Sequence, residues 1–203
     1  MFSGVYDYSK RSREQYPPVP VHTSQMAFEI LSLVKVYSTI KPMRVVEIGV
    51  QYGGTLWHWL TNAEQGATVV GIDWWNKNEM VEDPRQTWES WVPEGVNFHS
   101  IIGDTHKVTT KCTLMEIVDE IDFLFIDGDH TYEGVKQDWL MYGPLVRKGG
   151  IIAFHDLIKP EFSPHIGVGQ LWREIQRAGY MTQELYALPE NEQKWGGIGV
   201  VVK

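Results

Sequence analysis

Short apolar segments alternate with segments of helical periodicity along most of this chain, and this alternation constrains its fold more than any other feature. The apolar segments predict strands at residues 45–49, 68–73, 96–102, 121–126 and 151–154, and two closing strands near residues 180–187 and 198–202. Between them, apolar residues recur at the spacing of a helix face, as from Val168 to Ile175. Such alternation is typical of βαβ units around a mostly parallel sheet. The sequence therefore predicts an α/β fold with a doubly wound, Rossmann-like sheet of seven strands, in which the short final loop allows an antiparallel hairpin.

The composition is that of a globular protein. A length of 203 residues fits one domain, and 18 basic against 26 acidic residues give a formal charge of −8. That balance argues against nucleic acid or an anionic membrane as the main partner. Cys112 is the only cysteine, which excludes an internal disulfide and a thiolate zinc cluster. No stretch approaches the roughly 18 apolar residues of a membrane span, and the first residues lack the pattern of a signal peptide, so we expect a cytoplasmic protein.

Glycines follow the first predicted strand, at the edge where open α/β sheets bind their ligands. Glu47 and Gly49 end this strand, and Gly53 opens the next helix. Glycines there let the backbone approach a ligand closely, and a tight packing turn is the alternative explanation. The pattern is not the dinucleotide-binding fingerprint, because Gln51 replaces its second glycine.

Acidic residues follow the second and third strands. Asp73 is placed to bind the two hydroxyls of a ribose, and Asp104 to reach an adenine edge. Each acid taken singly is also explained as a solvated loop residue or a helix cap. Successive strands that each deliver an acid at the same sheet edge favour a nucleoside site, and the scarcity of nearby cations favours a ligand without phosphates.

The fourth and fifth strands end in groups that can bind a metal ion. Asp127, Asp129 and His130 follow the fourth strand, and His155 and Asp156 follow the fifth. Carboxylates and an imidazole on neighbouring strands suit Mg²⁺ or Mn²⁺, and Fe²⁺ is a further candidate. The alternative makes His155 a structural residue and Asp156 a cap. His130 titrates near neutrality and is a candidate base or, alternatively, a cap of the next helix.

These motifs resemble the class I S-adenosylmethionine-dependent methyltransferases. The resemblance rests on the strand-one motif 45–49 with Gly53, on residues 71–73, on the Ile-Asp-Gly-Asp-His-Thr-Tyr block at 126–132, and on the Gly-Gly to His-Asp segment 149–156. Within this class, the motifs most resemble the branch that contains cephalosporin-hydroxylase-like proteins and the sugar and macrolide O-methyltransferases. It covers residues 43–203 as a methyltransferase domain with an antiparallel last strand, and leaves residues 1–42 as an amino-terminal arm and helix.

The resemblance implies a role for each matching residue. The cofactor S-adenosylmethionine would be held by Glu47, Gly49, Gly53, Asp73, Asp104 and Asp127. The divalent metal would be held by Asp127, His155 and Asp156, and Asp129 would be the alternative to Asp127 as a ligand. Related enzymes often carry an acidic residue at the position of His155. Asp127 and His130 would be catalytic, with His130 as the base. The expected reaction is O-methylation of a small molecule, a sugar or natural-product scaffold, whose two vicinal oxygens chelate the metal.

Aromatic segments outside the shared core are candidates for binding the acceptor. Trp74, Trp75, Trp88 and Trp91 form either an acceptor platform or lid, or the packing face of a small helix at 84–92. Residues 157–167 should border the acceptor. The tyrosine-containing amino terminus could fold over the site or serve a subunit contact, so the sequence leaves a homo-oligomer open.

Three other functions compete with methyl transfer. An NAD-dependent oxidoreductase would also use Asp73 for a ribose, but the missing glycine and the absence of a Tyr-x-x-x-Lys pair argue against it. An iron oxygenase could use His130, His155 and Asp156, but such enzymes usually have a β-barrel fold. A non-catalytic cofactor-binding protein stays open.

Overall fold

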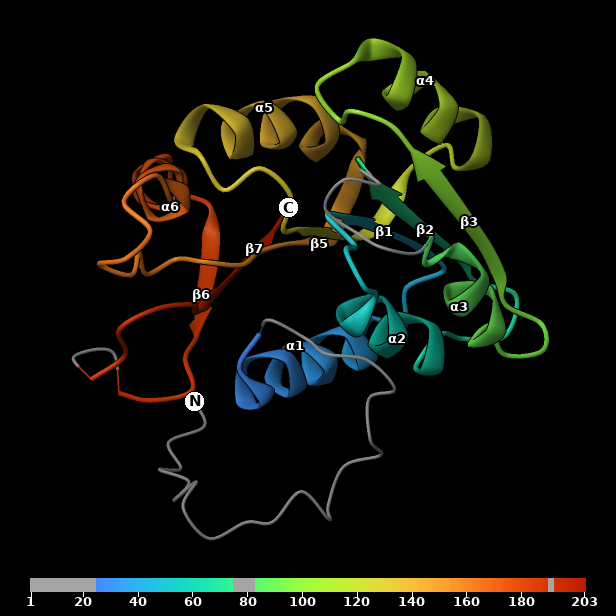
Figure 1. The fold of residues 1–203 in the computed structure, drawn as a ribbon, viewed down its shortest axis with the longest axis horizontal. Coiled ribbons are helices and arrows are strands. Elements are labelled where there is room, and N and C mark those ends of the chain that lie inside the picture. Colours follow the sequence, from blue (N-terminus) through green and yellow to red (C-terminus); the bar gives the residue numbers. More distant parts are fainter. Residues whose placement is uncertain (1–24, 75–82, 190–191) are drawn as a thin grey trace, which may run out of the picture.

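A seven-stranded sheet forms the centre of the molecule, as expected from the alternating pattern (Figure 1). The computed structural model describes residues 25–74, 83–189 and 192–203. The strands are β1 (Arg44–Ile48), β2 (Thr68–Asp73), β3 (Asn97–Ile102), β4 (Ile121–Ile126), β5 (Val146–Phe154), β6 (Met181–Leu185) and β7 (Ile198–Val202). Their order in the sheet is β3-β2-β1-β4-β5-β7-β6.

The first five strands run parallel, and β7 pairs antiparallel with both β5 and β6. The predicted α/β class, the doubly wound parallel sheet and the antiparallel last strand are therefore confirmed. The order reverses at β1 and β4, which are adjacent although β2 and β3 separate them in the chain. Ligands of open parallel sheets bind beyond the strand ends at such a switch point.

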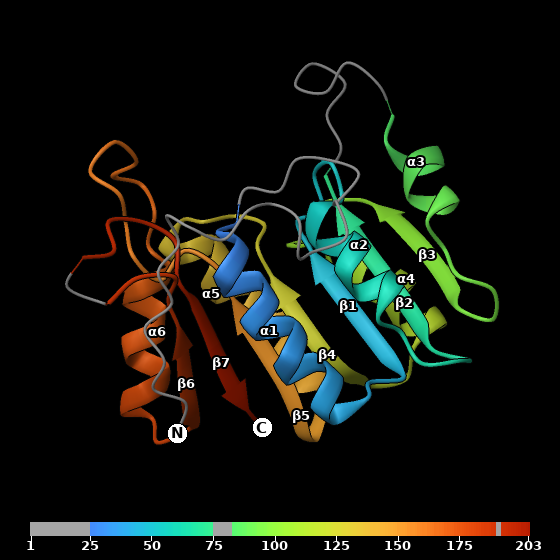
Figure 2. The same ribbon diagram turned by 90° about the horizontal axis from the view of Figure 1, so that it is seen from below.

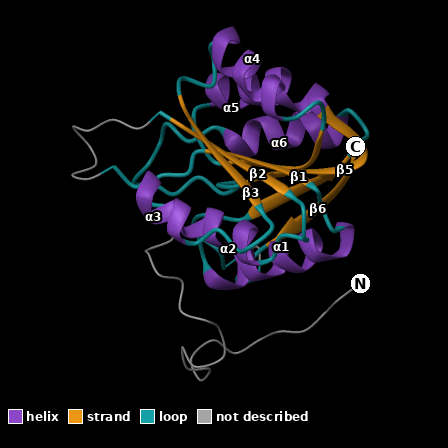
Figure 3. Cartoon of the chain, turned by 90° about the vertical axis from the view of Figure 1, so that its right-hand side faces the viewer, coloured by secondary structure: helices purple, strands orange, loops and turns teal. Residues whose placement is uncertain are grey.

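Helices cover both faces of the sheet (Figure 3). On one face lie α1 (Ala27–Ile40), α2 (Gly54–Thr61) and the short α3 (Arg85–Ser90), and Figure 2 shows α1 and α2 in front of the strands. On the other face lie α4 (Val108–Ile117), α5 (Tyr132–Tyr142) and α6 (Val168–Arg177), and a 3₁₀ turn, η2 (Gly143–Leu145), leads from α5 into β5. No helix in the described parts of the chain is both long enough and apolar enough to cross a membrane.

Two local features differ from the sequence prediction. Strand β5 starts at Val146, five residues before the predicted start at residue 151, and its pairing with β4 shifts register between Ile121 and Phe123. Helix α4 was not predicted, because only Thr110 and Leu114 of its residues are buried and its apolar pattern is weak.

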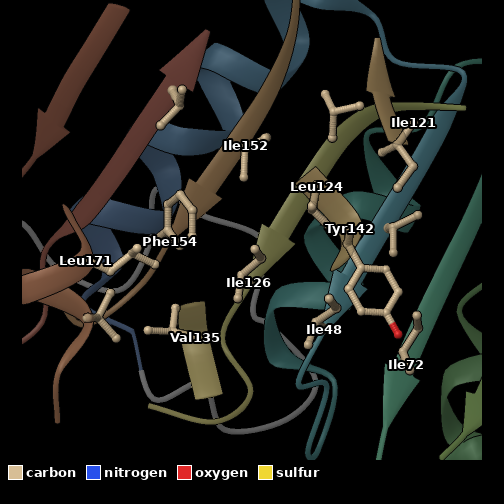
Figure 4. Close-up of a cluster of buried hydrophobic side chains, with 14 of the residues drawn as sticks. Ile48, Ile72, Ile121, Leu124, Ile126, Val135, Tyr142, Ile152, Phe154 and Leu171 are labelled. Atoms are coloured by element: carbon tan, nitrogen blue, oxygen red, sulfur yellow. The ribbon is translucent and has the colours of Figure 1, made fainter. Parts of the chain in front are cut away.

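Two apolar cores, one on each sheet face, fix the strands that carry the functional loops. The core beneath α5 and α6 joins Ile48, Leu124 and Phe154 to Val135 and Leu171 (Figure 4). Every residue of β4 is buried, as expected for a strand covered on both faces.

The core beneath α1 and α2 centres on three aromatic rings. Trp59 of α2 stacks on Tyr37 of α1 at 5.3 Å between ring centroids and lies 4.9 Å from the ring of Phe123 on β4. The Tyr37 hydroxyl donates a hydrogen bond to the Trp59 carbonyl at 3.2 Å. All three side chains are fully buried. Helix α1 is thus packed into the same core as the strands of the sheet.

A buried acid, Asp138 of α5, lies behind the loop that follows β4. Its side chain is fully buried, and its Oδ1 lies 3.5 Å from Nε2 of His106. Burial raises the pKa of the Asp138 carboxyl to about 6. The ionised form is therefore less stable in the folded chain than in the unfolded one.

The aromatic core predicts a large loss of stability on truncation of Trp59. We expect Trp59→Ala to lower the free energy of unfolding by about 3–5 kcal/mol, because it leaves a cavity between α1, α2 and β4. Urea unfolding measures this. The control Trp57→Ala removes the same side chain from a half-buried position on the same helix and should cost clearly less. Equal losses for the two variants would contradict the packing described.

The environment of Asp138 predicts a pH dependence of stability. Since its folded pKa is raised above the usual 3.8, this carboxyl favours folding below about pH 4, and that contribution is lost as the pH rises through about 6. Asp138→Asn should therefore raise the free energy of unfolding by on the order of 2–3 kcal/mol at pH 7, and by much less at pH 4. Denaturant titrations at both pH values test it, with the exposed Glu116→Gln as control. A gain independent of pH would count against this explanation.

Candidate active site

A pocket of about 850 Å³ opens at the carboxyl ends of the parallel strands. Its size is within the usual range for small-molecule sites. The residues predicted from sequence that line it are Gly49, Asp73, Asp104, Asp127, Asp129, His130, His155 and Asp156. Glu47 and Gly53 are not among the lining residues. The acids that follow successive strands therefore meet in one cavity.

The loop after β1 owes its path to two glycines that pack closely against neighbours. A Cβ on Gly49, whose φ is +84°, would lie 2.1 Å from the carbonyl oxygen of Asp127. A Cβ on Gly53, whose φ is +90°, would lie 2.5 Å from Nε1 of Trp88. The packing explanation therefore accounts for both glycines. Gly49 also borders the pocket, whereas the cofactor contact expected of Gly53 stays a prediction.

Asp73 holds the backbone of the same loop. One carboxylate oxygen, Oδ2, accepts hydrogen bonds from the amides of Val50 and Gln51, at 2.7 Å each. The other oxygen has no hydrogen bond within the described residues and is available to a ligand, since Asp73 lines the pocket. Asp73 can therefore shape the loop and bind a ligand at the same time.

Glu47 and Asp104, two further acidic residues predicted to bind the cofactor, differ in exposure. Glu47 is fully buried, accepts a hydrogen bond from the Thr55 hydroxyl, and burial raises its pKa well above the usual range. Glu47 itself does not line the pocket, but its hydrogen-bond partner Thr55 does. Asp104 lines the pocket directly, and its Oδ1 accepts a hydrogen bond from the His106 amide at 2.9 Å.

Two aspartates and two histidines form a compact cluster at the ends of β4 and β5. One side-chain atom each of Asp127, His130 and Asp156 lies within 4.8 Å of the others, a spacing that could hold a metal ion. Nδ1 of His130 is 3.1 Å from Oδ2 of Asp156 and 3.8 Å from Oδ1 of Asp127. Nδ1 of His155 is 3.4 Å from Oδ1 of each aspartate. The cluster thus brings in His130 beside the predicted ligands Asp127, His155 and Asp156.

The backbone at Asp156 is held in a conformation that side chains rarely adopt. Its φ is +63°, in the left-handed region, while β5 just before it is regular. A residue other than glycine costs of the order of 1–3 kcal/mol there and persists where the surroundings impose it, which is common at functional sites. The turn directs the Asp156 carboxylate toward His130 and His155.

Charges within this cluster stabilise one another. The hydrogen bond to Asp156 raises the pKa of His130, against the opposing effect of burial. Burial alone would raise the pKa of Asp156, but the hydrogen bonds from His130 and His155 hold it well below its usual range. Burial alone would lower the pKa of His155, yet the charge of Asp127 and hydrogen bonds to its neighbours raise it well above normal. The histidines and the aspartates therefore stabilise one another's charged forms.

Asp129 serves the turn into α5. Its Oδ1 accepts a hydrogen bond from the Thr131 amide at 2.9 Å, and the Thr131 hydroxyl caps the helix by accepting from the Gly134 amide at 3.1 Å. Asp127, rather than Asp129, therefore belongs to the cluster. The helix cap considered for His130 is supplied by Thr131.

Aromatic residues around the pocket divide into two groups. Trp88 is 1% exposed and donates a hydrogen bond to the Tyr52 carbonyl, and Trp91 packs partly buried beside it, as the small-helix explanation predicted. Trp74 and Phe162, by contrast, line the pocket and are 71% and 81% exposed. Trp75 and the tyrosines of the amino terminus lie outside the described residues.

Sequence reasoning missed several residues at or behind the pocket, three of which come from near the two ends of the described chain. Gln25, just before α1, donates a hydrogen bond to Oδ2 of Asp127. Glu29 of α1 is fully buried behind His155, and Trp195 lines the pocket from the loop before β7. Glu29 is four residues before Leu33 and eight before Tyr37, on the buried side of α1, but a single acid at such a position predicts exposure to solvent by default.

Comparisons with known proteins identify relatives of the chain. The family model described as "Methyltransferase domain" matches residues 46–157, more than half of the chain. An uncharacterized protein of Acanthamoeba polyphaga mimivirus is 31% identical over 137 residues, which are 66% of this chain and 62% of the viral protein. An uncharacterized protein of Sinorhizobium fredii is 24% identical over 149 residues, 67% of this chain and 15% of that protein. The chain thus spans less than two thirds of each relative.

Solved structures share the fold at low sequence identity. An O-methyltransferase from Bacillus cereus, in complex with S-adenosylhomocysteine (SAH), matches with a TM-score of 0.65 and 17% identity, over 91% of this chain and 84% of that one. The O-methyltransferase TomG from Streptomyces achromogenes, in complex with S-adenosylmethionine (SAM), matches with a TM-score of 0.62 and 15% identity, over 89% and 82% of the two chains. These structures share the fold, and the family match confirms the resemblance drawn from the motifs: the chain belongs to the methyltransferase domain family.

Proposed function

We propose that the chain transfers the methyl group of SAM to a hydroxyl of a small molecule, with the help of a divalent metal ion. The observation that carries this proposal is that Asp73 and Asp104 line the same cavity as Asp127, His130 and Asp156. A nucleoside bound at the first two acids would point its reactive end at the cluster. Methyl transfer requires such alignment of donor and acceptor more than any covalent help from the protein.

The charges around the pocket support SAM as the cofactor. The lining contains five aspartates, and the described lining residues contain no lysine or arginine. A sulfonium cation suits that environment, whereas the pyrophosphate of NAD does not. SAM and SAH are also the ligands named for the structural neighbours from Streptomyces and Bacillus.

The donor set of the cluster fits a divalent cation. Asp127 Oδ1 is buried and has no hydrogen-bond partner among the described residues, so a bound cation would satisfy it. We assign Asp127, His155 and Asp156 as ligands, a mixed oxygen and nitrogen set that suits Mn²⁺ or Mg²⁺ and, less well, Fe²⁺. When bound, the ion would lower the pKa of a coordinated acceptor hydroxyl.

His130 is the proposed base. Its Nδ1 faces Asp156, which leaves Nε2 as the ring nitrogen that can take the proton of the acceptor hydroxyl. Asp156 orients the ring and stabilises the imidazolium that results. The spacing of the cluster also allows His130 to join the ligand set, and the variants below separate these roles.

The acceptor is an uncharged small molecule, a sugar or natural-product scaffold with vicinal oxygens. Trp74 and Phe162 expose aromatic faces at the pocket, and such faces stack on sugar rings and planar systems. The acidic lining disfavours anionic acceptors. A cytoplasmic location and the absence of nucleic-acid and membrane partners stay predictions.

Cofactor binding is tested with Asp73→Ala. Loss of this carboxylate removes two hydrogen bonds to the loop amides and the proposed contact with the ribose, so SAH should bind about 10–100-fold more weakly by calorimetry. The control Glu94→Ala changes an exposed acid and should leave affinity unchanged. Wild-type protein that binds NAD and not SAH would favour the oxidoreductase alternative.

Metal dependence is tested by SAH formation with a panel of vicinal diols that includes catechol and simple glycosides. Chelation should abolish turnover and Mn²⁺ should restore it, and Asp127→Ala and Asp156→Ala should lose at least about 100-fold, because each removes a ligand. Full activity of either variant would reject the metal role.

The role of His130 follows from a different measurement. His130→Ala should lose about 10²–10⁴-fold in kcat while keeping the wild-type Kd for Mn²⁺, as expected for a base. Loss of Mn²⁺ binding would instead make His130 a ligand. If wild-type protein binds SAH and methylates none of these acceptors, the non-catalytic alternative gains support.

A further inference from the structure

We infer that helix α1 belongs to the catalytic centre, with Gln25 and Glu29 as positioning residues for Asp127 and His155. This inference rests on the proposed function, because it concerns the same metal cluster. The family model begins at residue 46, so it does not include these two residues. The evidence is their geometry at the amino-terminal end of α1.

Gln25 and Glu29 both lie at the amino-terminal end of α1. Gln25 is two residues before the first helical residue, and its Nε2 donates a hydrogen bond to Oδ2 of Asp127. Glu29 lies in the first turn of the helix, and its Oε2 is 3.8 Å from Nε2 of His155. This end of the helix therefore contacts two members of the cluster.

Glu29 is fully buried, and a buried carboxylate is costly unless its surroundings compensate it. Oε1 meets this cost by accepting hydrogen bonds from the Gly197 amide at 3.1 Å and from the side chain of Gln193. Oε2 has no hydrogen-bond partner within the described residues and lies 3.8 Å from Nε2 of His155. One oxygen thus anchors the loop before β7, while the other faces the cluster.

The position of Glu29 determines which nitrogen of His155 can serve a metal. A carboxylate opposite Nε2 favours the proton on that nitrogen. Nδ1 lies 3.4 Å from an oxygen of each of Asp127 and Asp156, and on metal binding it would give up its proton and offer its lone pair to the ion between them. Histidines that ligate metals almost always donate their other ring N–H to a carboxylate or a carbonyl, which fixes the ring and raises its basicity. Within the described residues, Nε2 of His155 and Oε2 of Glu29 are both buried without a hydrogen-bond partner, so a small approach of the two would form this bond. Glu29 therefore prepares His155 to act as a ligand.

A purely structural role for Glu29 makes a different prediction. If the carboxylate served only to bind the loop through Gly197 and Gln193, its replacement would lower stability and leave metal binding intact. The deciding measurement is therefore the affinity for Mn²⁺, made beside a variant that destabilises α1 without touching the cluster.

The experiment compares Glu29→Gln with Leu33→Ala in the full chain. Glutamine keeps the size of Glu29 and an oxygen for the loop but removes the charge opposite His155. We expect its Kd for Mn²⁺ to rise 10–100-fold by calorimetry, with the Kd for SAH within about twofold of wild type. Leu33 is fully buried on the same helix and has no polar group. Leu33→Ala should lower Tm and leave both Kd values within about twofold.

Gln25→Leu provides a second variant should Glu29→Gln fail to fold. Gln25 is only partly buried, and leucine removes the donor to Asp127 while keeping an apolar side chain. Its Kd for Mn²⁺ should rise about tenfold. Unchanged Mn²⁺ affinity in the folded variants, with Tm lowered as in Leu33→Ala, would overturn the inference. If wild-type protein does not bind Mn²⁺, the proposed metal and this inference are both wrong. If wild-type protein binds Mn²⁺ and the variants bind it equally well, this inference alone is wrong.

Discussion

The close crossing of two loops, the one after β1 and the one after β4, is the constraint on which the site depends. These strands are neighbours at the point where the strand order reverses. A side chain on Gly49 would collide with the carbonyl of Asp127, so the crossing requires glycine there. The crossing brings the nucleoside side of the pocket, marked by Asp73, next to the cluster around Asp127. Any larger residue would separate the two halves that the proposed reaction needs in contact.

Balance of charge is the second requirement, because the same crossing places several acids beside a low-dielectric core. Isolated, the buried carboxylates of Asp127 and Asp156 would be expensive. The histidines after the same two strands offset this cost, because Nδ1 of each ring lies within 3.8 Å of an oxygen of both aspartates, and the pKa values of both rings are raised as a result. Under the proposed function, a metal ion and a sulfonium would take over part of this role, so one negative pocket would attract both cations that the reaction uses.

Most of the fold and the location of the site followed from local sequence patterns. Strand β4 is apolar at nearly every position because helices cover both its faces, and this made it recognisable without any knowledge of its neighbours. Asp73 and Asp127 come directly at the ends of such strands, and parallel pairing is enough to bring strand ends to one edge. Helix α4 was not predicted, because most of its residues are not buried and its sequence therefore shows little apolar periodicity.

What the sequence did not reveal are contacts between distant segments that no strand pairing implies. Gly53 and Trp88 are far apart in the chain, and only the packed structure shows that the glycine makes room for the indole. Glu29 and His155 are further apart still, and a single acid in an amphipathic helix predicts a solvated position by default. Its full burial becomes intelligible only when α1 is docked by the Tyr37, Trp59 and Phe123 rings, because that docking directs the first turn of the helix at the cluster. The apolar contacts that fix the helix thus also determine which polar groups reach the site, which is why packing and chemistry cannot be separated at this end of the sheet.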